Sequence, residues 1–262
     1  MDLRNPVGCA TTPGRPGYGD LASRQAGALL GDGAVLVWND VADEGREQFY
    51  QWHDKEHVPE RLTIRGFRRG RRFASPGHSP EWLTMYEADD VAALTSPEYL
   101  ARLNAPTPHT VSTLRHFRNT SRAVCSLVHS VGASSGGYVL AMRLSVPADR
   151  AETMCRAIAG DLFPAAMALT GVVACHLYAS DQAASHVDTA ESSTRAFDVP
   201  SWVLLCEATH AAAAQRAREV IDGPEFSRLG VVVRPDVAVY ALEICRLAQP
   251  WRPNGEDVRS SP

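Results

Sequence analysis

The sequence predicts an α+β protein made of two β-α-β-β-α-β units whose antiparallel sheets pair into a barrel within one chain. Strand and helix signals follow one another in the same order twice along the chain. Local echoes link the two passes, because residues 80–82 (Pro-Glu-Trp) with Glu87 are matched by 200–202 (Pro-Ser-Trp) with Glu207 at equal spacing. Burial gives the third reason: a sheet with both helices on one face leaves its other face uncovered, and a second such sheet can cover it.

The first unit begins with the continuous apolar run 34–38, which has the length of a strand. A helix is expected over 43–56, where aromatic side chains recur at spacings of three and four residues, and Pro59 is expected to end it. The remaining elements, in order, are strands at 66–73 and 82–87 around a turn at 75–77, a helix over 89–103 that Pro97 interrupts, a short helix over 110–117 and a strand over 122–129.

The second unit repeats this order. Its expected elements are a strand at 138–146, a helix over 148–168 interrupted near Pro164, a strand at 172–179, a polar loop over 181–199, a strand at 202–207, a helix over 211–222 and a strand at 237–244. We therefore expect a flexible arm at 1–32, a first unit at 33–131, a second unit at 132–248 and a tail at 249–262.

The composition is that of an ordinary globular chain: 45% of the 262 residues are hydrophobic, 21% are charged, and the formal net charge is -4. Nucleic-acid binding is not expected, because it needs a positive surface. No stretch approaches the roughly 20 apolar residues that cross a bilayer, and no signal-peptide core follows the polar start. We expect a cytoplasmic protein without a membrane partner.

The six cysteines form no C-x-x-C pair, so neither a zinc ribbon nor a redox motif is expected. Four of them lie in apolar runs that resemble strands, and we expect these four to be buried thiols: Cys125, Cys175, Cys206 and Cys245.

The densest group of polar residues lies at 53–61 and contains His53, Asp54, Glu56, His57 and Arg61. On a helix, His53 and His57 are four residues apart and share a face. Imidazole suits proton transfer because its unperturbed pKa lies near neutrality. We expect His57 to act as general acid or base and Asp54 or Glu56 to orient it. The alternative is structural, with His53 packing or capping and His57 bonding to backbone.

The run 49–62 (FYQWHDKEHVPERL), followed by 64–67 (IRGF) and 70–73 (GRRF), resembles the EthD-like branch of the ferredoxin-like, dimeric α/β-barrel superfamily. The resemblance covers mainly residues 34–117, and the second half carries no comparable motif. It implies a ligand pocket between the helices and the sheet of the first unit. It also implies proton-transfer chemistry, such as isomerisation, ring closure or elimination, and in some members cofactor-free oxygenation.

Aromatic side chains could line such a pocket. Trp82 and Tyr86 point to one face of their strand together with Thr84. The residues expected to contact a substrate are Trp38, Trp52, Trp82, Tyr86, Arg61 and Asn104. Core packing is the alternative for each aromatic residue, and helix termination is the alternative for Asn104.

Six arginines crowd residues 61–72: Arg61, Arg65, Arg68, Arg69, Arg71 and Arg72. We expect most of them to be solvated or paired with the acidic residues Glu87, Asp89 and Asp90. One or two of them could bind a substrate carboxylate, for which the planar guanidinium is well suited.

Two alternatives depend on a bound metal. Residues 53–57 spell H-x-x-E-H, the inverted zinc-protease signature, but Pro59 follows at once and no third ligand is evident, so we expect no metal and no cofactor. Haem-binding members of the superfamily use a tandem barrel, and this resemblance leaves His176 or His210 open as an axial ligand.

The leading hypothesis is a cofactor-independent enzyme of isomerase, cyclase or lyase type, or a cofactor-free monooxygenase. Its substrate would be a small, partly apolar molecule such as an aromatic or polyketide-like compound. The alternative is a non-catalytic protein that binds a small ligand or serves as an accessory protein, and haem-dependent chemistry is a weaker one. Association into a further homodimer stays open, because the internal pairing already supplies the contact that a dimer would provide.

Overall fold

The computed structural model describes residues 28–194 and 196–249. Most of the expected arm at 1–32 and nearly all of the expected tail at 249–262 lie outside the described residues. The strands and helices up to residue 131 are β1 (Gly33–Val41), α1 (Arg46–Trp52), α2 (Val58–Arg61), β2 (Phe67–Ala74), β3 (Trp82–Ala88), α3 (Pro97–Asn104), α4 (Pro108–Leu114) and β4 (Phe117–Val131).

The elements that follow repeat the order of the first ones with two additions, a short helix α7 and a short strand β8. They are β5 (Tyr138–Ser145), α5 (Ala151–Ala157), α6 (Phe163–Met167), β6 (Val172–Ser180), α7 (Gln182–Ser185), β7 (Trp202–Ala208), α8 (Ala211–Ile221), α9 (Pro224–Arg228), β8 (Val232–Val233) and β9 (Ala238–Leu247).

The strands form one antiparallel sheet in the order β7-β6-β4-β1-β3-β2-β9-β5-β8, and an additional pairing of β7 with β5 closes eight of them into a barrel. The four strands of each unit are neighbours, and β4 pairs with β6 and β2 with β9 where the units meet. The predicted fold class, an α+β chain whose two sheets pair into an α/β barrel, is therefore confirmed.

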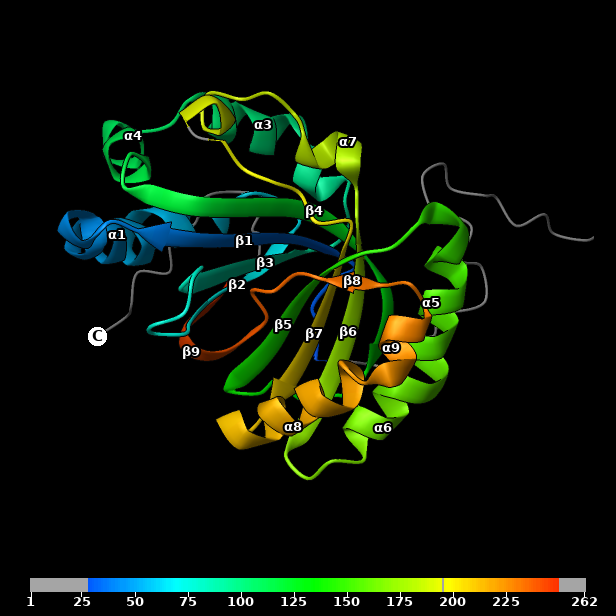
Figure 1. Ribbon diagram of the computed structural model, residues 1–262. Helices are drawn as coiled ribbons and strands as arrows, with labels where there is room; N and C mark the ends of the chain where they lie inside the picture. Colours follow the sequence, from blue (N-terminus) through cyan, green and yellow to red (C-terminus); the bar gives the residue numbers. More distant parts are fainter. Residues whose placement is uncertain (1–27, 195, 250–262) are drawn as a thin grey trace, which may run out of the picture.

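The helices cover the outside of the barrel in two groups. In Figure 1, α1, α3 and α4 lie at the upper left, whereas α5, α6 and α9 lie at the lower right and α8 lies at the bottom. Strand alternation separates the two sides of each sheet. On β1, for example, Leu36 and Trp38 pack inside the barrel against Tyr178 of the second unit, while Val35 and Val37 face the helices.

Two helix boundaries that were predicted from prolines are wrong. The first helix does not end at Pro59, because a π-helical turn over His53–His57 widens the backbone ladder and α2 continues to Arg61. The second unit repeats this device with a π-helical turn over Ile158–Leu162 before Pro164. Pro97 does not interrupt a helix but begins α3, where the Ser96 side chain accepts a hydrogen bond from the backbone N–H of Tyr99.

A network of buried charges lies where the two units meet. Arg71 of β2 donates to Glu207 of β7 at 2.8 Å and lies 3.1 Å from Glu87 of β3, and all three side chains are at most 2% exposed. Arg69 binds Glu87 at 2.7 Å, and His176 Nε2 lies 3.5 Å from Glu207. The expected pairing of this segment's arginines with Glu87 is thus present for Arg69 and Arg71, whereas their burial and the second partner Glu207 were not expected.

Cysteine burial is confirmed at Cys125, Cys175 and Cys206. The prediction was wrong for Cys245, which is exposed, because the second half of β9 presents side chains to solvent beyond the part that pairs with β5.

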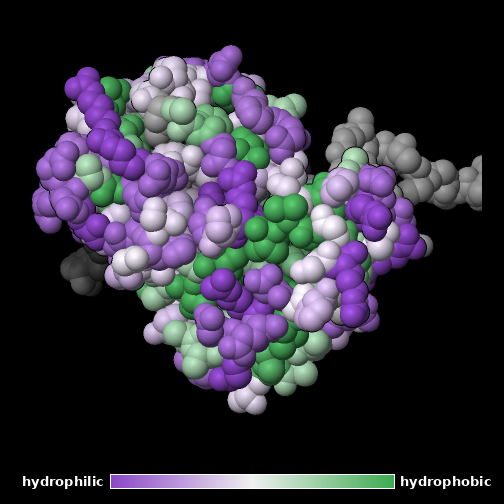
Figure 2. Space-filling view, viewed as in Figure 1, coloured by the Kyte–Doolittle hydropathy of each residue, from purple (hydrophilic) through white to green (hydrophobic). Residues whose placement is uncertain are grey.

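Within the described part of the chain, no helix is long and apolar enough to cross a membrane. Figure 2 shows a largely hydrophilic face with apolar side chains gathered at its centre, around β8, where Val232 is 64% exposed.

Candidate functional site

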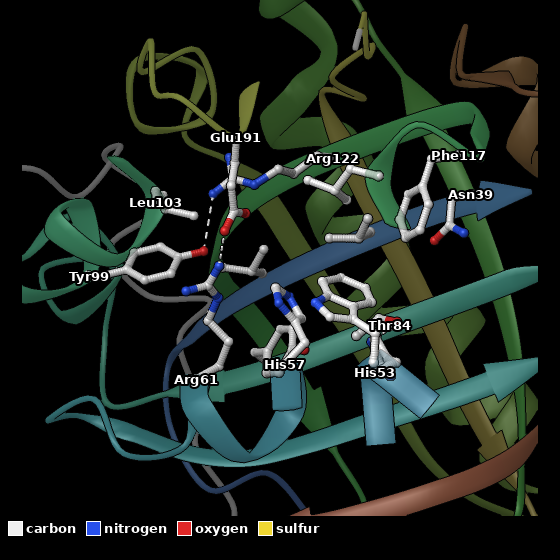
Figure 3. A pocket seen from close by; sticks show the side chains of 15 residues that line it. Asn39, His53, His57, Arg61, Thr84, Tyr99, Leu103, Phe117, Arg122 and Glu191 are labelled. Atoms are coloured by element: carbon white, nitrogen blue, oxygen red, sulfur yellow. Dashed lines mark hydrogen bonds and ion pairs between the residues drawn. The ribbon is translucent and has the colours of Figure 1, made fainter. Parts of the chain in front are cut away.

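A cavity lies between the outer face of the first unit's sheet and the helices that cover it. The space not filled by protein atoms is about 510 Å³, including open solvent at its mouth. The lining side chains come from β1, β3 and β4, from the first helix, α3 and α4, and from one segment of the second unit that carries Glu191. Figure 3 shows His57 and Arg61 on one side, with Glu191 and Arg122 opposite them.

The π-helical turn presents both histidines to this cavity. The rings of His53 and His57 are 5.8 Å apart between centroids, and His57 packs on the ring of Trp52 at 4.2 Å. Trp52 is itself fixed, because its indole N–H donates to the Thr110 hydroxyl of α4 at 2.9 Å. The pair of imidazoles expected from the sequence is therefore brought together at the cavity wall.

His53 is held in one protonation state. Arg72 Nη1 lies 2.9 Å from His53 Nδ1, and a guanidinium can only donate, so Nδ1 accepts and Nε2 carries the proton, facing the Thr84 hydroxyl at 3.4 Å. Burial, reinforced by the charge of Arg72, lowers the pKa of His53 well below its usual value. His53 is thus a neutral hydrogen-bond donor rather than a base at neutral pH.

The two carboxylates expected to orient His57 are engaged elsewhere. Asp54 binds Arg72 at 2.5 Å, on the side of the helix that faces β2 and β9. Glu56 accepts a hydrogen bond from the Thr107 hydroxyl and lies 2.8 Å from His109 Nδ1 at the start of α4. The structure therefore places both carboxylates against neighbouring elements, β2 for Asp54 and the start of α4 for Glu56.

The opposite end of the cavity is charged. Arg61 is 2% exposed and donates a hydrogen bond to Glu191, and its guanidinium lies over the ring of Tyr99 at 5.7 Å. Its other amino group, Nη1, makes no hydrogen bond among the described residues and lies 3.6 Å from Glu60. Arg122 donates to the Tyr99 hydroxyl at 3.4 Å, which places a second guanidinium at this end (Figure 3).

Tyr86 supplies a polar group in the cavity wall. Its side chain is buried, its hydroxyl has no hydrogen-bond partner in the described part of the chain, and burial raises its pKa, so it stays protonated. Gly70 of β2 makes room for the ring, since a Cβ at this position would lie 3.2 Å from Tyr86 Cε1. A buried phenol without a partner is a donor that a ligand oxygen can use.

Three residues expected to contact a substrate do not line the cavity. Trp38 points into the barrel, because strand alternation puts it on the opposite face from Val35 and Val37. Trp82 packs with Phe49 and Arg46 beyond the cavity's end. Asn104 ends α3 and accepts a hydrogen bond from the backbone N–H of Ala190 at 3.1 Å, so it anchors the segment that carries Glu191.

Sequence reasoning missed Glu191, Arg122 and Tyr99. Glu191 lies in the polar loop between β6 and β7, 130 residues after Arg61, and no local pattern connects the two. Tyr99 lies on α3 and Arg122 on β4, and no motif in the sequence singles out either residue.

Neither histidine considered as a haem ligand fits that role. His176 is fully buried, with Nδ1 2.9 Å from the Ser130 hydroxyl and Nε2 beside Glu207. His210 caps α8, where Nδ1 accepts from the backbone N–H of Ala213 at 3.1 Å. The described residues also bring together no cluster of three or more His, Cys, Asp or Glu side chains that could hold a metal ion.

No protein-family model matches the chain, and no curated protein matches it. Among solved structures, it is similar to an anthrone oxidase-like protein, with a TM-score of 0.56 and 11% identity over 87% of this chain and 95% of that one. It is also similar to a putative chlorite dismutase, with a TM-score of 0.52 and 11% identity over 82% of this chain and 96% of that one. A variant chlorite dismutase from Candidatus Nitrospira defluvii has a TM-score of 0.51 and 9% identity over 87% of this chain and 95% of that one. At these identities the likeness defines the fold, a ferredoxin-like α/β barrel.

Proposed function

We propose that this protein is an enzyme that transfers a proton on a small, partly apolar aromatic molecule bound in the cavity of the first unit. The observation that carries the proposal is the placement of the His57 ring on Trp52, in the same cavity wall as the buried, unpartnered hydroxyl of Tyr86. An imidazole that can accept a proton beside a phenol that can only donate suits a substrate with an acidic C–H group next to a carbonyl.

The proposed step uses residues that already line the cavity. His57 takes the proton from carbon, and the electron pair of the broken C–H bond moves to the carbonyl oxygen. Tyr86 donates a hydrogen bond to that oxygen, and Arg61 Nη1 lies nearby to offset its charge. Return of the proton from His57 to a different carbon of the substrate gives isomerisation. Attack of the enolate carbon on a second carbonyl of the same substrate, with the proton passing to the new alkoxide oxygen, gives ring closure, and departure of a β-hydroxyl group with that proton as water gives elimination.

The anthrone oxidase-like neighbour suggests a test substrate. Anthrone is a tricyclic ketone whose methylene C–H is acidic because the resulting anion spreads onto the carbonyl oxygen. Aromatic side chains of the cavity lining, including Trp52, Tyr99 and Phe117, are of the kind that contacts an aromatic ligand. Reaction of the anion with oxygen would extend the same first step to oxygenation.

The experiment measures exchange of anthrone's methylene protons for deuterium in D₂O under nitrogen, by NMR. We expect His57→Ala to slow the enzyme-dependent exchange by about 100-fold or more, which is the usual contribution of a positioned acid or base. Tyr86→Phe should slow it by roughly 10- to 1,000-fold. His109→Ala is the matched control, because His109 lies outside the cavity lining. Equal exchange rates for wild type and His57→Ala would refute the proposal, and binding without exchange would favour a ligand-binding protein.

We also propose that the chain is a tandem duplication of a unit of the EthD-like branch, with units at 33–131 and 132–248. Three features recur at a constant separation of 105 residues: the π-helical turns that begin at His53 and Ile158, the prolines at 59 and 164, and the glycines with positive φ at 66 and 171. Two unrelated halves would not be expected to share such irregular backbone features at one spacing.

A further inference from the structure

A second cavity adjoins the first at its charged end. It encloses about 440 Å³ of space not filled by protein atoms, again including open solvent, and its apolar lining residues include Leu94, Leu100 and Phe197. Leu103, Arg122 and Glu191 line both cavities. The side chain of Glu191 therefore stands at the boundary between the two spaces.

The turn that carries Glu191 is rigidly built. Thr189 and Ser192 exchange hydrogen bonds between their hydroxyls and backbone N–H groups at 2.8 and 3.1 Å. The backbone N–H of Glu191 donates to the carbonyl of Leu103 at 3.1 Å, beside the anchor that Asn104 provides. The backbone is thus fixed to the end of α3, and the Glu191 side chain is the part that can move.

The contact that Glu191 makes resembles one that a bound carboxylate would make. Its carboxylate accepts from buried Arg61, with Arg122 at the same end of the cavity. Arg122 lines the same end and donates to the Tyr99 hydroxyl, and Glu60 lies 3.6 Å from the other amino group of Arg61. The unpartnered Tyr86 hydroxyl, buried in the wall of the same cavity, is a further donor without an acceptor among the described residues.

We propose that Glu191 is an internal anion that occupies the place of a ligand's carboxylate on Arg61. An aromatic carboxylate entering the first cavity displaces the Glu191 side chain into the second cavity and takes its hydrogen bond. The proposal rests on the proposed function in using the same cavity, and it adds aromatic molecules that carry a carboxylate to the ligands that this cavity binds. No covalent bond changes in this step.

The test compares binding of two molecules of the same shape, 2-naphthoate and 2-naphthamide, by isothermal titration calorimetry at fixed salt. In Glu191→Gln, the naphthoate no longer competes with an internal charge, so we expect it to bind roughly 10- to 100-fold more tightly than to wild type, the range that one charge-assisted hydrogen bond contributes. The affinity for naphthamide should change by less than about threefold. In Arg61→Gln, the preference for the anion should disappear.

Glu152→Gln is the matched control, because this glutamate lies on α5 in an exposed pair with Arg156. If Glu191→Gln unfolds, Glu191→Asp tests the same idea, since the shorter side chain keeps the charge but reaches Arg61 less well, and it should give a smaller gain. An unchanged or weaker affinity of a folded Glu191 variant for naphthoate would overturn the proposal.

This outcome is separable from the proton-transfer test. 2-Naphthoate has no acidic C–H group, so its binding does not depend on the chemistry of His57. Failure of anthrone exchange together with the expected naphthoate result would leave an aromatic-anion site without that reaction. Anthrone exchange without tighter naphthoate binding by Glu191→Gln would support the proton-transfer reaction and exclude the proposed role of Glu191.

Discussion

Replacement of Arg71 tests how much the buried charge network between the two units contributes to the stability of the fold. The Arg71 guanidinium lies between Glu207 at 2.8 Å and Glu87 at 3.1 Å, with side-chain exposure of 2%, 1% and 1%. Replacing Arg71 by Met removes the only cation that bridges these carboxylates in the described residues, and leaves two buried anions with one cation fewer. Removing one partner of a buried pair costs about 3–5 kcal/mol, which corresponds to a fall in Tm of about 6–20 °C for a protein of this size.

Arg68→Met is the matched control, because Arg68 lies on the same strand and binds Asp89 at 2.5 Å with both side chains about half exposed, 51% and 45%. An exposed pair contributes about 0–1 kcal/mol. Urea unfolding followed by far-UV circular dichroism, with equal m values required, gives both free energies of unfolding. A cost for Arg71→Met within about 1 kcal/mol of that for Arg68→Met would refute the view that this network stabilises the fold.

Three further predictions concern pH, glycine and thiol chemistry. Burial alone would raise the pKa of Glu207, but contact with His176 and the charge of Arg71 outweigh it and lower that pKa to about 2. Because the pKa is lower in the folded than in the unfolded protein, ionised Glu207 stabilises the fold above its unfolded pKa, and this stabilisation is lost as the pH falls. The difference in free energy of unfolding between wild type and Glu207→Gln should therefore narrow by about 2 kcal/mol from pH 6 to pH 3; a constant difference would contradict this. Gly66→Ala and Gly171→Ala should each cost about 1–3 kcal/mol in urea unfolding, because φ is 92° and 94° at these positions, and neutral substitutions would show that the backbone can relax. Peptide mapping after brief alkylation should find Cys245 modified before Cys125, whose burial raises its pKa to about 12; equal labelling of the folded protein would exclude the described burial.

The order of strands and helices could be predicted because it depends on local periodicity and on turn residues. Closure of the barrel followed from a physical requirement, since each sheet has one face that its own helices do not cover. The boundaries at Pro59 and Pro97 could not be predicted in the same way. A π-helical turn accommodates the first and an N-cap makes use of the second, and both depend on backbone geometry rather than on composition.

The candidate site was only partly predictable. His53, His57, Arg61, Trp52 and Tyr86 line one cavity because they lie on neighbouring elements of the first unit. Alternation along β1 shows that Trp38 and Val37 lie on opposite faces, but it does not say which face lies inside the barrel. Glu191 could not be predicted, because its contact with Arg61 joins residues 130 positions apart, and Glu191 lies in a loop without a periodic pattern.

Comparison of the two units shows what makes the cavity. The positions 105 residues after His53, His57 and Arg61 are occupied by three apolar residues of the second unit's core: Ile158, Leu162 and Ala166. The π-helical turn is present in both units, so it belongs to the backbone around each proline and does not by itself create a site. The same backbone can therefore be filled with apolar side chains. The first unit instead keeps a buried guanidinium and a phenol whose hydroxyl has no partner in the described residues, at a cost of about 1–3 kcal/mol for each unsatisfied group. The fold does not require this cost, and a bound ligand with polar oxygens would offset it.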